Sequence, residues 1–293
     1  MGTLVCIGLG YSAAHYLSIS KQFDRVVGTT RSLRHAALPS ERHVELVEFD
    51  GTTAPAELIA RVEESDALLI SAPPGETGDP VLARLADAIA RGRTRAIVYL
   101  STIGVYGDSG GAWVDEDTVP RPSSPRSVAR LAAEEAWRRL GAENGKSVAV
   151  LRLAGIYGPG RNALVTLAEG TARRIVKPGQ VFNRVHVDDI AQAIDACFTQ
   201  RANGIFNLAD DEPAPPQDVI TFAAGLTGKP PPPEIPFDEA RNGMSAMAQS
   251  FYAENRRVRN DKLKQTLGVR LAYPTYRDGL RELFAAGEEG GTE

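Results

Sequence analysis

The sequence has little cysteine, little histidine and no long apolar run. Its 293 residues include 2 cysteines, Cys6 and Cys197, too few to brace a chain of this length with disulfides. Both lie in apolar strand-like or helix-like patterns, so we expect two buried, reduced thiols in a cytoplasmic protein. The 4 histidines show no paired metal-ligand spacing, and we expect no metal site.

An excess of positive charge is also missing. With 33 Lys and Arg against 37 Asp and Glu, the net charge of −4 offers no basic field for nucleic acid or an anionic membrane. No apolar run approaches the roughly 18 residues that span a bilayer. Met1 leads into a strand-like run without a cationic leader, so we expect no signal peptide.

The chain is rich in short apolar runs that alternate with helical patterns. We expect strands at Thr3–Ile7, Arg25–Thr29, Val44–Phe49, Ala67–Ser71, Ala96–Ser101, Val148–Leu153 and Ile205–Leu208. We expect helices at Ser12–Ser20, Ala56–Glu64, Val81–Arg91, Ser127–Leu140, Val187–Thr199, Gln217–Leu226 and Asp261–Leu267. Several strands are apolar throughout, which is typical of a parallel sheet with helices on both faces. The alternation predicts an α/β fold with a Rossmann-type, doubly wound parallel sheet.

The pattern changes after about residue 210, where proline-rich connectors such as residues 229–236 begin. This change predicts a second, smaller C-terminal substrate lobe. The expected division is a dinucleotide-binding domain of residues 1–160, to which 181–210 return, and a substrate lobe of residues 161–180 and 211–293. The tail 287–293 is expected to be disordered.

A glycine-rich turn follows the first strand and opens the first helix. It reads Gly-Leu-Gly-Tyr-Ser-Ala, the G-x-G-x-x-A pattern. Gly8 permits the tight turn, Gly10 lets the backbone approach a pyrophosphate, and Ala13 keeps the helix close to the sheet. Tyr11 and Ser12 begin the helix, whose free N–H groups and positive dipole end attract phosphate. The turn therefore predicts a dinucleotide site.

The end of the second strand bears on which dinucleotide is bound. An acid there would bind the ribose 2′-OH of NAD, but the chain reads Thr30-Arg31-Ser32, and Arg34 follows. An arginine with neighbouring hydroxyls suits a 2′-phosphate, so we expect NADP(H) in preference to NAD(H). Further cofactor contacts are expected from other strand ends, namely Asp50 at the adenine and Ser71, Ala72 and Pro73 beside the pyrophosphate and ribose.

Four ordered motifs continue this pattern along the chain. Residues 101–107 read STIGVYG, residues 152–161 RLAGIYGPGR, residues 184–190 RVHVDDI and residues 206–213 FNLADDEP. Together with the glycine turn they resemble the extended short-chain dehydrogenase/reductases, which include the NAD-dependent epimerase/dehydratase family. The resemblance covers almost the whole chain and is specific for the fold, but it does not specify the reaction.

The resemblance implies a Ser or Thr, a Tyr and, four residues on, a Lys. Thr102 matches the Ser or Thr position of the family, and we expect the preceding Ser101 to contact the cofactor. The segment 125–134 matches the Tyr–Lys helix, but Arg126 stands at the Tyr position and Arg130 at the Lys position. Arg130 could still serve the nicotinamide ribose, whereas Arg126 cannot replace a phenol, because a guanidinium does not release its proton near neutral pH. The chain is therefore identified as an atypical member that lacks the Tyr–Lys pair.

Three other side chains are candidates for the missing proton donor. Tyr106 could instead pack beneath the cofactor. Tyr157, at the carboxyl edge of the sheet, could instead form a wall of the substrate pocket. His186 precedes Asp188 and Asp189, one of which we expect to cap the following helix. A structural role for His186 is the rival interpretation.

Two further segments have open roles. The loop 107–124, glycine-rich and acidic with Trp113, either closes over a substrate or is a surface excursion. Arg256 and Arg259 either meet an anionic substrate or belong to a solvated face.

These observations predict an NAD(P)-dependent oxidoreductase or epimerase/dehydratase-like enzyme. Its substrate would be a small hydroxyl or carbonyl compound or a nucleotide-sugar, with Thr102, Tyr106, Tyr157 and Arg130 as candidate catalytic residues. The alternative is a catalytically inactive NADP(H) sensor or scaffold, and a third option is a structural relic without cofactor. We expect no nucleic-acid or membrane partner, and two flanking helices could pair in a homodimer.

Overall fold

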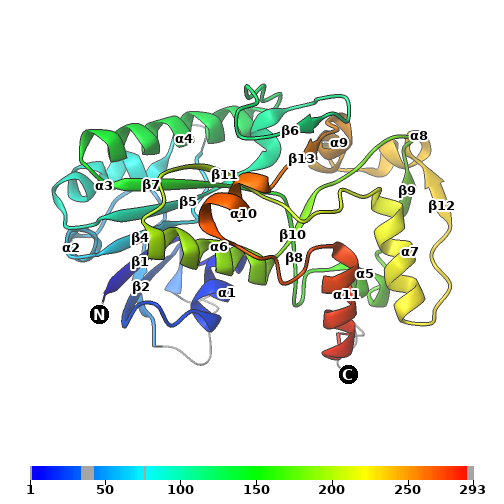
Figure 1. Ribbon diagram of the computed structural model, residues 1–293, viewed down its shortest axis with the longest axis horizontal. Coiled ribbons are helices and arrows are strands. Elements are labelled where there is room, and N and C mark those ends of the chain that lie inside the picture. Colours follow the sequence, from blue (N-terminus) through cyan, green and yellow to red (C-terminus); the bar gives the residue numbers. More distant parts are fainter. Residues whose placement is uncertain (1, 34–42, 76, 289–293) are drawn as a thin grey trace.

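A seven-stranded parallel sheet lies at the centre of the molecule, in a computed structural model that describes residues 2–33, 43–75 and 77–288 (Figure 1). Across the sheet the strands are β11 (Gly204–Leu208), β7 (Ser147–Leu153), β5 (Ala96–Thr102), β4 (Ala67–Ile70), β1 (Thr3–Ile7), β2 (Arg25–Thr30) and β3 (Glu45–Glu48). The connections reverse direction between β1 and β4, where an α/β sheet binds its ligand. The predicted α/β, Rossmann-type fold is confirmed.

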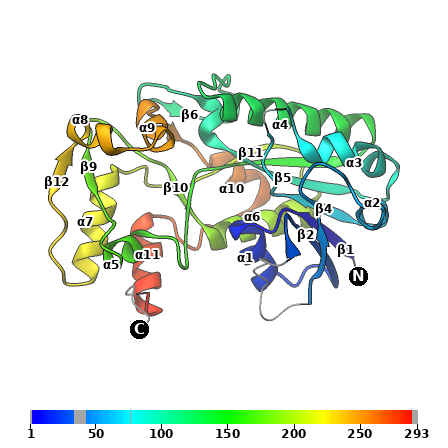
Figure 2. The same cartoon turned by 180° about the vertical axis from the view of Figure 1, so that it is seen from behind.

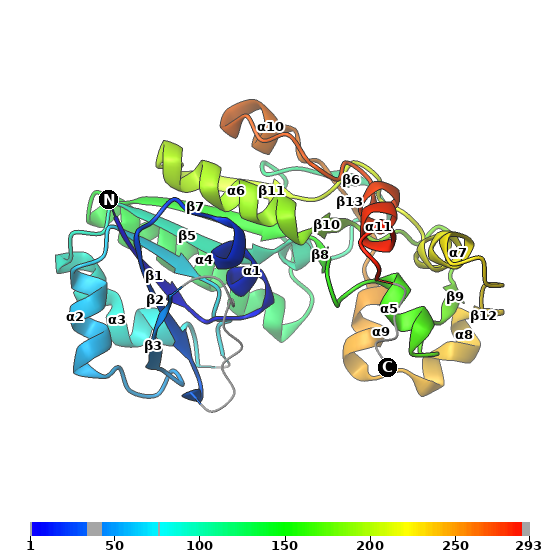
Figure 3. The same ribbon diagram turned by 90° about the horizontal axis from the view of Figure 1, so that it is seen from below.

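Helices cover both faces of the sheet (Figures 1 and 3). One face carries α1 (Tyr11–Ile19) and α6 (Val187–Gln200), and the other carries α2 (Ala56–Glu63), α3 (Pro80–Arg91) and α4 (Pro125–Glu143). Strand β1 explains the apolar runs: Leu4 and Cys6 enter the first core, whereas Val5 and Ile7 enter the second. Since successive side chains of a strand point to opposite faces, a strand buried on both must be apolar throughout.

A smaller layer of helices lies beside the carboxyl edge of the sheet (Figure 2). It consists of α5 (Ala163–Ala168), β9 (Arg174–Val176), α7 (Pro216–Leu226), β12 (Glu234–Pro236), α8 (Phe237–Ala240), α9 (Ala246–Ala253) and α11 (Tyr276–Ala285). β9 pairs with β12, and α5, α7 and α11 share a separate apolar core. Helix α10 (Asp261–Leu267), which we expected in the smaller lobe, instead packs against α6 and β11. Residues 289–293 of the expected disordered tail lie outside the described residues.

Two short parallel ladders fasten the layers together. β8 (Gly155–Tyr157) pairs with β10 (Arg184–His186), and β6 (Trp113–Val114) pairs with β13 (Arg257–Val258). The second ladder anchors the loop 107–124, because the N–H groups of residues 109 and 111 donate to the Asn255 carbonyl at 3.0 and 2.9 Å. The loop is thus hydrogen-bonded to residues 255–258, which lie about 140 residues downstream in the chain. In the described part of the chain, no helix combines the length and apolar character needed to cross a membrane.

Candidate functional site

The glycine-rich turn forms an open cradle at the switch point of the sheet. Gly8 has φ +92°, its N–H donates to Thr29 Oγ1 at 2.9 Å, and a Cβ on it would lie 2.8 Å from the Ala72 nitrogen. Only glycine fits there. Gly10 is the N-cap of α1, no side chain caps that end of the helix, and a Cβ on Gly10 would meet only Ser71 Oγ, at 3.9 Å. The exposed N–H end and the free space fit a pyrophosphate.

Tyr11 joins this cradle to the turn after β8. Its hydroxyl donates to the Pro159 carbonyl at 2.9 Å, the Arg161 guanidinium lies 5.7 Å from its ring centroid, and burial raises its pKa to about 12. Ser12 and Ala13 are buried. The first turn of α1 is therefore held rigidly at the carboxyl edge of the sheet.

The end of the cradle at which we expect the adenosine carries charges of both signs. Arg31, just after β2, is exposed, and Thr30 Oγ1 beside it donates to the Ser32 carbonyl at 3.1 Å. Glu48 at the end of β3 lies opposite Thr30 in the strand register. Sequence reasoning missed this carboxylate because it lies on a neighbouring strand. Arg34 lies outside the described residues.

Two further predicted cofactor contacts are exposed. Asp50 accepts hydrogen bonds from the Thr52 N–H and hydroxyl at 2.8 and 2.7 Å, and these bonds lower its pKa. Pro73 follows β4 with its ring open to solvent. Both residues lie at strand ends on the carboxyl edge, as predicted, and their contact with a cofactor stays a prediction.

The nicotinamide end of the expected site lies at the end of β5. Thr102 caps the short 3-10 helix η2 (Ile103–Tyr106), and its Oγ1 accepts a bond from the Gly104 N–H at 3.1 Å. Arg130 Nη1 donates to the Tyr99 hydroxyl at 3.1 Å and to the Leu100 carbonyl at 2.9 Å. Arg126 is exposed, 5.7 Å from the Phe251 ring centroid on α9. The two arginines at the Tyr and Lys positions therefore point to different neighbours.

The two candidate tyrosines are both buried. The Tyr106 hydroxyl donates to Asn207 Oδ1 at 2.7 Å, its ring lies 4.8 Å below the Arg152 guanidinium, and burial raises its pKa. The Tyr157 hydroxyl lies 3.4 Å from the Thr275 carbonyl, and burial likewise raises its pKa. Tyr157 also lines a cavity of about 280 Å³. These contacts favour packing for Tyr106 and a pocket wall for Tyr157.

His186 itself caps α6, so the expected cap by Asp188 or Asp189 is wrong. Its Nδ1 accepts the Asp188 N–H at 3.2 Å, and burial lowers its pKa to about 4. The carboxylates have other partners: Asp188 contacts His15 Nε2 at 2.5 Å, and Asp189 accepts two backbone N–H groups, at 2.6 and 3.2 Å. His186 is thus a neutral, structural side chain near neutral pH.

The sequence analysis did not predict a buried ion pair between Arg152 and Glu134 next to the site. Arg152 and Glu134 are 2% and 1% exposed, and Arg152 Nη2 lies 2.8 Å from Glu134 Oε2. Ser101 Oγ donates to the other carboxylate oxygen of Glu134. The pair therefore holds the end of β5 to α4, directly beside Thr102.

The arginines of residues 255–260 have internal partners. Arg256 donates to the Gly107 carbonyl and pairs with Glu254 at 2.7 Å. Arg259 lies over the Trp113 ring, 5.2 Å from its centroid, and lines a second cavity of about 280 Å³. Among the residues that the structure describes, no cluster of three or more His, Cys, Asp or Glu could hold a metal ion.

The sheet order, the glycine cradle at its switch point and the hydroxyl at the end of β5 define a Rossmann-type protein of the short-chain dehydrogenase/reductase class. The family model for the NAD dependent epimerase/dehydratase family matches residues 80–209. This match agrees with the resemblance that the sequence predicted.

Three known proteins illustrate the similarity. A functionally unknown conserved protein from Silicibacter pomeroyi is 44% identical with TM-score 0.86, over 98% of this chain and 100% of that one. The 3-diazoavenalumate denitrifying reductase of a Streptomyces species is 29% identical over 211 residues, 68% of each chain. MoeE5, solved with UDP-glucuronic acid and NAD, shares the fold with TM-score 0.78 at 21% identity, over 96% of this chain and 97% of that one.

Proposed function

We propose that this protein is an NADP(H)-dependent oxidoreductase that reduces a small carbonyl compound or oxidises the corresponding alcohol. The observation that carries the proposal is the uncapped N-terminus of α1, with Gly8 and Gly10 at the switch point and Thr102 on the same sheet edge. This arrangement supports a dinucleotide that lies across the edge and ends beside a hydroxyl.

Each group has a defined task in this proposal. A bound nicotinamide supplies or accepts the hydride. The N–H groups of α1 hold the pyrophosphate, Arg130 contributes positive charge near the ribose, and Thr102 orients the reacting oxygen. Arg126 donates no proton, because its guanidinium stays charged.

The similarity to a Streptomyces reductase supports a reductase rather than an epimerase or dehydratase. The same cofactor would also serve epimerase- or dehydratase-like chemistry on a nucleotide-sugar, which MoeE5 binds as UDP-glucuronic acid. The decisive assay follows NADPH oxidation by the purified protein with aldehydes, ketones, nucleotide-sugars and diazo compounds. We expect turnover with at least one carbonyl, and a loss of about 10²-fold in Thr102→Ala. No turnover on the whole panel would contradict the proposal.

The preference for NADP(H) rests on Arg31, whose exposed guanidinium follows β2 between two hydroxyl residues. Such a group pairs with a 2′-phosphate. We expect Arg31→Ala to weaken NADPH binding about tenfold and NADH binding hardly at all, with the distant, exposed Arg91→Ala as control. Glu48→Gln is expected to strengthen NADPH binding, because it removes a nearby negative charge. Equal losses for both cofactors in Arg31→Ala would refute the 2′-phosphate contact.

A second candidate is a catalytically inactive NADP(H) sensor. The observation in its favour is Arg126, which replaces the phenol and points to Phe251. This candidate predicts NADPH binding by fluorescence without hydride transfer to any compound of the panel, together with a co-purifying partner. A structural relic predicts instead that Gly10→Asp leaves any NADP(H) affinity unchanged.

We also propose that the protein resides in the cytoplasm. Cys6 and Cys197 are both free and buried. Reduced thiols of this kind are usual in a reducing compartment.

A further inference from the structure

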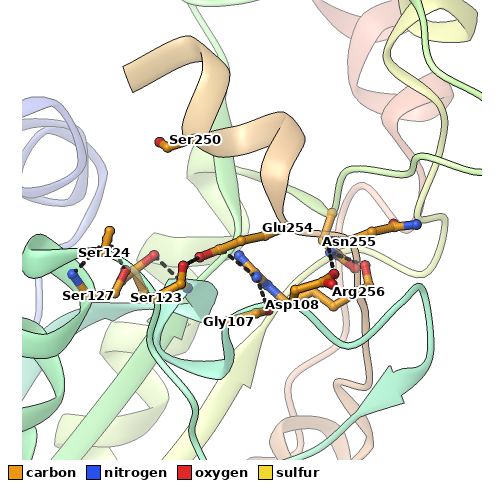
Figure 4. A network of polar contacts seen from close by, with 12 residues as sticks. Gly107, Asp108, Ser123, Ser124, Ser127, Ser250, Glu254, Asn255 and Arg256 are labelled. Carbon is orange, nitrogen blue, oxygen red and sulfur yellow. Dashed lines mark hydrogen bonds and ion pairs between the residues drawn. The ribbon is translucent and has the colours of Figure 1, made fainter. Parts of the chain in front are cut away.

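The start of α4 contains a pair of serines close to the place that the family gives to its tyrosine (Figure 4). Ser124 is the N-cap of the helix, and Ser127 lies in its first turn, next to Arg126. Arg126 turns outward to Phe251, whereas Ser127 is only 5% exposed. The buried side of this turn therefore presents a hydroxyl next to Arg126, the residue at the tyrosine position.

Two hydrogen bonds join these serines. Ser124 Oγ accepts the Ser127 N–H at 3.1 Å and donates to Ser127 Oγ at 2.9 Å. Ser127 Oγ thus accepts a hydrogen bond from Ser124. The hydroxyl proton of Ser127 itself has no acceptor among the residues that the structure describes. A substrate oxygen would satisfy that free donor.

The hydroxyls of Ser127 and Thr102 both lie near the position that a side chain on residue 104 would occupy. A Cβ on Gly104 would lie 3.1 Å from Ser127 Oγ and 3.4 Å from Thr102 Oγ1. Thr102 Oγ1 accepts the Gly104 N–H at 3.1 Å, and its own proton likewise has no acceptor among the described residues. Two hydroxyl donors, one from α4 and one from β5, therefore converge beside Gly104.

We propose that Ser127 takes the place of the absent tyrosine, so that it and Thr102 hold the reacting oxygen while Ser124 relays a proton. This inference rests on the proposed reductase function. With a dihydronicotinamide bound to supply the hydride to the carbonyl carbon, the C=O π electrons would move to the substrate oxygen. That oxygen takes the Ser127 proton, Ser127 takes the Ser124 proton, and Ser124, which is half-buried, is reprotonated by water. No group in this relay has to be an ion at rest.

A polar network keeps the serines in position (Figure 4). Ser123 Oγ donates to Glu254, and Glu254 pairs with Arg256 at 2.7 Å. Arg256 in turn donates to the carbonyl of Gly107, just after η2. The network thus links the start of α4 to the loop after η2.

Two substitutions separate the relay from helix capping. Ser127→Ala removes the donor to the substrate, and we expect a fall in kcat of about 10²-fold with unchanged NADPH affinity. Ser124→Asp keeps a strong N-cap but cannot donate to Ser127, so turnover should fall at least tenfold at an unchanged melting temperature. Ser250→Ala, which changes a hydroxyl on α9 that donates to the Met247 carbonyl outside the relay and its network, should keep kcat within about twofold.

A crystal structure of the NADPH complex gives a readout besides activity. We expect an ordered water within about 3 Å of both Thr102 Oγ1 and Ser127 Oγ, lost in Ser127→Ala. If Ser127→Ala unfolds, Ser124→Asp and this water decide the question.

The outcomes distinguish the relay from the proposed function. A fall in Thr102→Ala, with Ser127→Ala or Ser124→Asp as active as the wild type, would overturn the relay and leave the reductase intact. A wild type that binds NADPH but reduces no compound of the panel overturns both. A crystal structure of the NADPH complex in which Ser127 Oγ points away from the nicotinamide would also overturn the relay.

Discussion

The buried Arg152–Glu134 pair gives the sharpest prediction for stability. Glu134→Leu removes a carboxylate that is 1% exposed and accepts from Arg152 at 2.8, 3.2 and 3.3 Å and from Ser101. Nη1 of Arg152 already has no partner, so the substitution leaves the whole guanidinium charged and buried without a counter-charge. Removing one partner of such a pair costs about 3–5 kcal/mol.

That loss is a large fraction of the roughly 5–15 kcal/mol by which a domain is stable. For a chain of this size it corresponds to a fall in melting temperature on the order of 10 °C. The double variant Glu134→Leu with Arg152→Met should recover most of the loss, because it removes both charges and keeps apolar volume. Glu135→Gln, an exposed neighbour on the same helix, is the matched control and should change stability by less than about 0.5 kcal/mol.

The assay is guanidinium chloride unfolding of all four proteins, followed by far-ultraviolet circular dichroism and tryptophan fluorescence. Trp137 is fully buried on α4, one turn from Glu134, and reports on this helix. A loss below about 1 kcal/mol in Glu134→Leu would refute the reasoning, because it would mean that water or rearrangement satisfies the Arg152 charge. A double variant no more stable than Glu134→Leu would show that packing, not charge, carries the effect.

Three further predictions concern buried groups. Burial raises the pKa of Asp210 to about 8, so the folded state holds an extra proton between about pH 4 and 8 and loses stability as pH rises through that window. Asp210→Asn should flatten this dependence and unfold later than the wild type at pH 9, by on the order of 1–3 kcal/mol. Burial raises the pKa of Cys197 to about 12, so maleimide should label neither it nor Cys6 in the folded protein, but both in denaturant. Gly279→Ala should cost about 1–3 kcal/mol, since its Cβ would lie 2.2 Å from the buried Tyr157 hydroxyl, and Tyr157→Phe should relieve part of that loss.

The local pattern of the sequence predicted the main sheet well. β1 spans Thr3–Ile7, the range expected, since alternate side chains must enter two cores and a glycine at φ +92° ends the run. The edge strand is less well predicted. We expected Val44–Phe49, whereas β3 is Glu45–Glu48, because Val44 and Phe49 are buried without belonging to the ladder.

The candidate site was predicted where it depends on backbone form and missed where it depends on distant partners. The cradle requires glycine at residue 8 and has free space beside Gly10, and both glycines are visible in six consecutive letters of the sequence. His186, and not an aspartate, caps α6, because Asp188 contacts His15, which lies 173 residues away in the chain. No local pattern predicts such a pairing.

The sequence alone determined the fold class, and it predicted the family resemblance and the position of the glycine cradle. These follow from periodicity, glycine geometry and motif order, which act over a few residues at a time. Only the tertiary structure decided which hydroxyls stand beside Thr102, that Arg126 points outward, and that the loop 107–124 is bound to β13. Those contacts join residues far apart in the chain, and their energies exist only after the sheet has closed and both cores have packed.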